Sequence, residues 1–299
     1  MSRPSTATVA LVGATVAVSF SAIFIRLASD DPATVVWLRM SMAAALLAPF
    51  AMRDARRGVV ARSRRDVALV LAGGVLLAGH FLLWTASLAF TSVAASVLLV
   101  SLHPVIVAPL GLRLLGERPH RRTYVGMALA LGGTVLTCAG DVRVDPRALQ
   151  GDLLAVGGAV CLAGYLLIGR GVRRSLGVAG YSLVVYATVA LVAALTAVGF
   201  RAAHVPSPRV ALLGLALAVV CTIGGHTVYN WALRHVHAVT VSLSFLGEPP
   251  LAALLALALL ASVPSPSTVG GGVLILAGLA LALLDVRPQE PSEPLLALE

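Results

Sequence analysis

Long apolar runs separated by short polar stretches make up almost the whole chain. A membrane-spanning helix needs about 20 mostly apolar residues, and ten runs reach or approach that length. They cover residues 7–27, 33–52, 67–89, 92–112, 122–140, 152–170, 179–199, 209–231, 238–261 and 267–284. The pattern predicts an all-α integral membrane protein with ten transmembrane helices. Residues 287–299 are rich in proline and glutamate, which favours a disordered tail.

Composition agrees with this fold class. Of the 299 residues, 59% are hydrophobic and 12% are charged, and the mean hydropathy is +0.95. A soluble domain carries about 25% charged residues. The net charge of +9 comes with arginines at the ends of apolar runs rather than on one face, so no nucleic-acid partner is expected. Cys138, Cys161 and Cys221 lie inside apolar runs, and no metal site or cofactor is predicted.

Arginine placement predicts the orientation, because cytoplasmic loops of membrane proteins are enriched in basic residues. If the N-terminus is cytoplasmic, fourteen arginines lie inside: Arg53, Arg56, Arg57, Arg62, Arg64, Arg65, Arg113, Arg118, Arg121, Arg122, Arg170, Arg173, Arg174 and Arg234. Five lie outside: Arg26, Arg143, Arg147, Arg201 and Arg209. We therefore expect a multi-pass protein of the cytoplasmic (inner) membrane with both termini, including the tail, in the cytoplasm.

The two halves of the chain repeat one pattern. A shift of 146 residues places Gly79 and His80 on Gly225 and His226, and a shift of 145 places Pro104 on Pro249. Each repeat, 1–146 and 147–286, contains five predicted helices, and an odd number inserts the halves in opposite orientations. Inverted repeats are typical of secondary transporters, whose substrate sites lie at the repeat interface near the midplane.

A carboxylate and two prolines interrupt the ninth apolar run. Proline removes a backbone donor and clashes with the preceding turn, so Pro249 and Pro250 predict a broken helix with Glu248 at the break. Irregular backbone at membrane depth is tolerated beside protein or a water-filled cavity. A purely structural Glu248, held by a neighbouring helix, is the alternative. His103, before Pro104, is the symmetry counterpart of Glu248, and the pair predicts a shared or relayed proton. Alternatively, His103 bonds a backbone carbonyl one turn away.

Other polar groups inside apolar runs are candidates for a binding site, because isolation in hydrocarbon is costly. His80 and Trp84 share one helix face, as do His226, Tyr229 and Asn230. They either line a cavity or form hydrogen bonds between helices, and Tyr165 could also line the pathway. Arg39 either reaches the outer headgroups or meets an anionic substrate or carboxylate. Glu117 is expected to cap or bridge the turn near Arg118, Arg121 and Arg122. The candidates are Glu248, His103, His80, Trp84, His226, Tyr229, Asn230, Tyr165 and Arg39, with helix breaks at Pro104, Pro249 and Pro250.

The glycine-rich runs 126–133 and 270–278 occupy symmetry-related helices. Small residues at this spacing let two helix backbones approach closely. These helices are expected to act as structural supports or as a homodimer contact, without touching substrate.

Three segments resemble the EamA-like ten-helix branch of the drug/metabolite transporter superfamily. They are "LHPVIVAPLGLRLLGERPHRRTYVGMALALGGTVL" (102–136), "GDLLAVGGAVCLAGYLLIGR" (151–170) and "GHTVYNWALRHVHAVTVSLSFLGEPPLAALLALALL" (225–260). The chain departs from the family where Ala261 and Ser262 replace a second Gly-Glu turn, and where His103 replaces an apolar residue. The resemblance implies a carrier of small metabolites or drugs.

The sequence therefore predicts a secondary transporter that works by alternating access, with export favoured and proton coupling as the energy source. It is not expected to be an enzyme, since no phosphate-binding loop and no clustered catalytic motif occur. A membrane enzyme acting on lipid and a non-transporting scaffold remain alternatives. Its expected partners are a small-molecule substrate and membrane lipid.

Overall fold

The computed structural model describes residues 6–56, 63–91, 93–138, 148–173, 176–200, 204–261 and 263–284. Within these ranges the regular structure is helical. The uninterrupted helices are α3 (Pro32–Arg56), α4 (Arg64–Ser87), α7 (Arg121–Cys138), α8 (Ala148–Val172), α9 (Val178–Gly199) and α14 (Pro266–Leu283). Outside the described residues lie the predicted tail 287–299 and six arginines used for orientation: Arg57, Arg62, Arg143, Arg147, Arg174 and Arg201.

Four of the predicted helices are divided into shorter pieces. The first consists of α1 (Thr6–Ser19) and α2 (Ser21–Ala28), and the fourth of α5 (Val93–Val100) and α6 (His103–Leu115). The eighth consists of α10 (Pro208–Ala216), the π-helix η1 (Leu217–Thr227) and α11 (Val228–Ala232). The ninth consists of α12 (Ala238–Phe245) and α13 (Glu248–Leu260).

The breaks in the fourth and ninth helices fall at the predicted prolines. Pro104 and Pro249 occupy the first turns of α6 and α13, where a missing N–H is tolerated. Before each break a backbone hydrogen bond spans three residues instead of four. Leu102 N–H donates to Leu99 O, and Leu246 N–H donates to Leu243 O. His103 and Glu248 are thus the first residues of corresponding half-helices.

Nine stretches in the described ranges are long and apolar enough to cross a membrane. They are Thr6–Ala28, Pro32–Arg56, Arg64–Ser87, Ala95–Leu115, Ala148–Val172, Val178–Gly199, Pro208–Ala232, Ala238–Leu259 and Pro266–Leu283. The protein is therefore an all-α integral membrane protein. The predicted span 122–140 corresponds to α7, which has 18 residues and begins with two arginines that lower its mean hydropathy.

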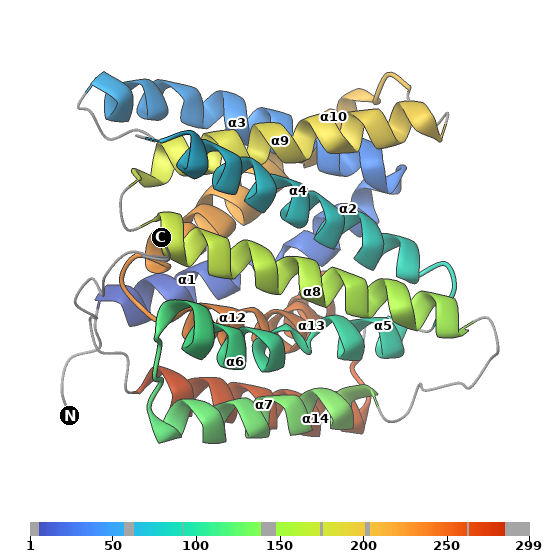
Figure 1. Cartoon of the computed structure of the whole chain (residues 1–299). Helices are drawn as coiled ribbons and strands as arrows, with labels where there is room; N and C mark the ends of the chain where they lie inside the picture. The colour runs from blue at the N-terminus through green and yellow to red at the C-terminus, as the bar shows by residue number, and fades with distance from the viewer. Residues whose placement is uncertain are drawn as a thin grey trace.

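The long helices lie side by side in one bundle, with α7 and α14 at one edge and α3, α9 and α10 at the opposite edge (Figure 1). Helices α7 and α14 touch through the predicted glycines. A Cβ on Gly126 would lie 2.4 Å from Gly278 O, and a Cβ on Gly133 would lie 2.5 Å from Gly271 O. This confirms the expected close packing of the two helices.

Two ends of the bundle matter for the site. Helices α4 and α8 pack antiparallel, since Gly151 lies against Ser87 and Gly164 against Leu76. The start of α3 is at the same end as Ser87, and we call this the Pro32 end. The C-terminal end of α8 marks the opposite end, which we call the Arg170 end.

Candidate functional site

A cavity lies inside the bundle where α12 gives way to α13, and we call it the central cavity. It has two adjoining parts of about 170 Å³ and about 120 Å³. Both are lined by Ala22, His80, Trp84, Phe245 and Glu248. The larger part also includes His103 and Pro249, and the smaller part includes Arg39 and His226. Besides Glu248, five of the candidate residues predicted from the sequence therefore line one cavity: Arg39, His80, Trp84, His103 and His226.

The central cavity reaches toward the Pro32 end. Its smaller part is lined by Asp30 and Pro32, next to the first turn of α3. Asp31 Oδ1 accepts the backbone N–H groups of Ala33 and Thr34 at 2.9 Å and 3.1 Å, and so caps α3 at this end. Asp30 faces His204, whose Nε2 lies 2.9 Å from Asp30 Oδ1.

Arg39 is the most deeply placed charge of the cavity. It is 4% exposed, so it does not reach the headgroups. Its Nε donates to Thr222 Oγ1 at 2.6 Å, and its guanidinium carbon lies 5.2 Å from the centre of the Phe81 ring. Thr222 belongs to η1 and donates in turn to Leu217 O, five residues back, at 3.1 Å. The wider π-helical turn therefore places the hydroxyl that orients Arg39; such turns often occur at functional sites.

Three nitrogen atoms of the cavity lining have no hydrogen-bond partner within the described part of the chain. They are Arg39 Nη2, Trp84 Nε1 and His226 Nδ1. The only other buried side-chain atom of this kind in the described ranges is Tyr181 Oη. An unfilled buried donor costs about 1–3 kcal/mol. The cavity therefore concentrates unused donor capacity at one place.

Glu248 and His103 share the larger part of the cavity but do not bond each other. His103 Nδ1 lies 2.6 Å from Ser242 Oγ on α12, and its ring meets Phe245 edge-on at 6.0 Å. His80 Nδ1 lies 3.0 Å from Gly158 O, so it carries the proton there, and its ring stacks on Trp84 at 6.2 Å. Shared or relayed protonation of His103 and Glu248 stays a prediction.

The remaining candidates are not among the residues that line the cavity; they lie in a buried hydrogen-bonded layer, in which the Tyr229 ring packs 4.2 Å from the Phe245 ring of the cavity wall. Tyr165 Oη donates to Asn230 Oδ1 at 2.5 Å, and Asn230 Nδ2 donates to Ser182 Oγ at 3.1 Å. Tyr229 Oη lies 2.9 Å from Thr15 Oγ1. Of the two sequence alternatives for Tyr229 and Asn230, the geometry matches hydrogen bonding between helices, and Tyr165, which was expected to line the pathway, also bonds another helix. We use the name polar layer for five residues: Thr15, Tyr165, Ser182, Tyr229 and Asn230.

Glu117 binds residues far from its own turn. The expected partners were Arg118, Arg121 and Arg122, but its Oε1 lies 2.5 Å from Arg170 Nε, with both side chains almost fully buried. Its Oε2 accepts the backbone N–H of Ala238 at 2.9 Å, at the start of α12. Glu117 therefore joins α6 of the first half to α8 and α12 of the second half.

Two further arginine contacts reinforce the same region. Arg170 Nη1 donates to Leu233 O at 2.7 Å. Arg173 Nε donates to Asn230 O at 3.0 Å, and Arg173 also bonds Leu176 O. Burial lowers the pKa of Arg173 to about 10. These contacts close the bundle at the Arg170 end, on the far side of the polar layer from the cavity.

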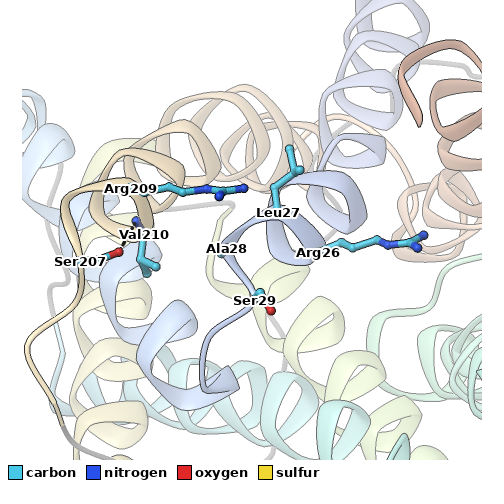
Figure 2. A pocket seen from close by; sticks show the side chains of 7 residues that line it. All are labelled: Arg26, Leu27, Ala28, Ser29, Ser207, Arg209 and Val210. Atoms are coloured by element: carbon cyan, nitrogen blue, oxygen red, sulfur yellow. Dashed lines mark hydrogen bonds between the residues drawn. The ribbon is translucent and has the colours of Figure 1, made fainter. Parts of the chain in front are cut away.

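A larger cavity of about 480 Å³ lies at the surface between the end of α2 and the start of α10. Figure 2 shows that the Arg26 side chain extends away from Arg209, while Ser207 Oγ accepts the Val210 N–H at 3.3 Å to cap α10. Both arginines are exposed. Its charged groups do not converge, so the smaller central cavity is the better candidate site.

A bundle of membrane-crossing helices with broken helices and buried charges around an internal cavity is the architecture of a membrane transporter. The family model of the EamA-like transporter family matches residues 5–139 and, a second time, residues 149–284. The chain belongs to this family.

Two known proteins are similar to this chain. The chain is 25% identical over 228 residues to "Uncharacterized transporter YwfM" of Bacillus subtilis (strain 168), covering 75% of this chain and 76% of that protein. It also matches a crystal structure of a protein with 24% identity and a TM-score of 0.78, covering 94% of this chain and 99% of the other. The second likeness supports the fold alone.

Proposed function

We propose that the protein is a secondary transporter that moves a small metabolite across the cytoplasmic membrane by alternating access, with proton coupling and with export as the working direction. The central cavity carries the proposal: a carboxylate and a guanidinium lie inside the bundle at the break of a spanning helix. Drug-sized ligands occupy pockets of about 300–1,000 Å³, so a cavity of about 170 Å³ and about 120 Å³ suits a small solute.

The asymmetry between the two ends supports alternating access. The cavity reaches Asp30 at the Pro32 end, whereas the polar layer and the Glu117–Arg170 pair close the other end. Basic side chains gather at the Arg170 end, which corresponds to the cytoplasmic side under the positive-inside rule. In this arrangement the cavity faces outward, and both termini are cytoplasmic if α7 makes the tenth crossing beside α14.

The test combines ligand binding with transport. A metabolite library is screened by thermal stabilisation of the purified protein, since a ligand that binds the folded state raises its apparent stability. Each hit is then tested for counterflow in liposomes that contain the protein. We expect counterflow with at least one hit, and its loss in Trp84→Ala.

The control is Asp152→Asn, a carboxylate variant outside the cavity, which should keep full counterflow. Binding without counterflow would contradict a transporter and favour a scaffold. Chemical conversion of a hit would favour a membrane enzyme. For the coupling, Glu248→Gln should remove the pH dependence of counterflow, and a His103→Leu variant with unchanged pH dependence would exclude the histidine from the proton path.

A further inference from the structure

The central cavity holds more hydrogen-bond donors than the protein uses. Arg39 Nη2 and Trp84 Nε1 are donors only, and both lack a partner in the described ranges. His226 Nδ1 also lacks one there, while Arg39 and His226 are 4% and 5% exposed. All three side chains line the same part of the cavity. A ligand that fills this set presents acceptors, and a carboxylate offers two acceptor oxygens that a guanidinium can bind side by side.

The acceptor side of the cavity is Glu248. It lines both parts of the cavity and is close enough to Arg39 for electrostatic attraction. Glu248 is nevertheless in neither of the ion pairs Arg170–Glu117 and His204–Asp30, and among the described residues no ion pair joins it to Arg39. Arg39 therefore keeps one side of its guanidinium open toward the cavity that contains Glu248.

We propose that the central cavity binds a small organic monoanion with an aromatic or apolar body, and that the anionic group and the Glu248 carboxylate compete for Arg39. This rests on the proposed function and adds the substrate class to it. Phe81, Trp84 and Phe245 supply the apolar walls. When Glu248 holds a proton, Arg39 is free for the anion. When Glu248 loses that proton, its carboxylate pairs with Arg39 and the anion leaves.

The competition links one proton to one anion, so the two cross the membrane together, and the loaded state has the same net charge as the empty deprotonated state. Export in this mode is driven by an outward gradient of the anion, which carries the proton out with it. Other titratable groups besides Glu248 surround the cavity. Helices α1 and α14, which pack against α13, contain none, and α2 contributes Arg26. The groups across the cavity or next to it are Asp30, Arg39, His80, His103, Cys221, His226 and Tyr229.

The experiment compares three probes that share one ring and differ in charge: benzoate, benzamide and benzylammonium. Binding to the purified full-length protein is followed by thermal stabilisation at about pH 5.5 and about pH 7.5, where carboxylates such as benzoate are ionised in water. We expect benzoate to bind at least about tenfold more tightly than the other two. We also expect its affinity to fall at the higher pH, as Glu248 loses its proton.

Two variants separate the steps. Glu248→Gln cannot ionise, so benzoate should bind equally well at both pH values, while Asp152→Asn should keep the wild-type pH dependence. Arg39→Lys keeps the positive charge but loses the planar guanidinium that can bind a carboxylate through two hydrogen bonds. It should therefore weaken the binding of benzoate by at least about tenfold. If an Arg39 variant fails to fold, the comparison of the three probes on the wild-type protein still decides the charge preference.

Several outcomes would overturn the anion class while leaving a carrier in place. Benzylammonium or benzamide could bind as tightly as benzoate. Phenylglycine, a zwitterion, could bind while benzoate does not and lose binding in Glu248→Gln, which would assign both charges to substrate contacts. All three probes could fail while library ligands of another charge bind and exchange. If no library compound binds or exchanges, the proposed function itself fails.

Discussion

Removing one member of the Glu117–Arg170 pair should destabilise the protein strongly. Both side chains are almost fully buried, and their closest atoms lie 2.5 Å apart. Breaking such a pair leaves an uncompensated buried charge and costs about 3–5 kcal/mol. Glu117→Ala also removes the acceptor for Ala238 N–H. We therefore expect the free energy of unfolding to fall by about 3–5 kcal/mol in Glu117→Ala.

The charge and the hydrogen bond can be separated. Glu117→Gln keeps an amide oxygen for Ala238 N–H and loses the charge, so it should cost about 2–3 kcal/mol. Arg170 would still donate to Leu233 O, which is neutral. In the double variant Glu117→Gln, Arg170→Gln, neither charge is left buried alone. Its cost should be smaller than the sum of the single costs by about 1–3 kcal/mol.

Equilibrium unfolding in mixed detergent micelles, followed by circular dichroism, measures these values. Arg113→Gln is the matched control, because Arg113 is an exposed arginine in the last turn of α6 and should change stability by less than about 0.5 kcal/mol. A cost below about 1 kcal/mol for Glu117→Ala, or strict additivity in the double variant, would refute the reasoning.

Three further predictions concern packing, pH and a helix end. Gly133→Ala should destabilise the protein by about 1–3 kcal/mol in the same unfolding assay, because the new Cβ would meet Gly271 O at 2.5 Å. The control Gly132→Ala should be neutral or stabilising, because a Cβ there has nothing within 4 Å. Burial, with a smaller contribution from Arg170, lowers the pKa of His237 from 6.5 to about 4. Between these two pH values the unfolded chain binds a proton that the folded protein does not, so the stability of the fold decreases as the pH drops. His237→Gln should reduce that decrease in a pH series of melting temperatures. Ala261→Gly should stabilise by about 0.5–1 kcal/mol, because Ala261 ends α13 with a φ of 52°, and Gly116→Ala should have the opposite effect at the matching end of α6, where φ is 65°.

The apolar pattern and the prolines predicted the parts of the fold that depend on local sequence. The spans follow from run length, and the breaks before Pro104 and Pro249 follow from the missing proline N–H. The ends of α6 and α13 show a limit of this approach. The sequence differs there, with Gly116 in one half and Ala261 in the other, yet both residues adopt the left-handed conformation. Backbone geometry is thus more alike between the halves than the residues are.

The sequence predicted which residues make up the candidate site better than it predicted which of them reach the cavity. A stripe such as His226, Tyr229 and Asn230 shows which residues share a helix face but gives no distance to the facing helix. The structure separates them, with His226 at the cavity and the other two in the polar layer. The π-helix that places Thr222 beneath Arg39 had no recognised signal in the sequence. For Glu117 the sequence pattern predicted partners among the arginines next to it, because its partner Arg170 lies 53 residues away.

The way each end is held bears on how a carrier of this shape could work. Contacts that close one end must break when the cavity opens there, and water then enters. Polar groups such as Glu117 and Arg170 recover hydrogen bonds from that water, whereas separated apolar surfaces do not. In the alternating-access cycle that we propose, closing the Arg170 end with an ion pair and backbone acceptors would therefore keep the two arrangements close in free energy. The glycine contacts of α7 and α14 offer no such exchange, and these helices should move together as a fixed support while α6, α8 and α12 rearrange.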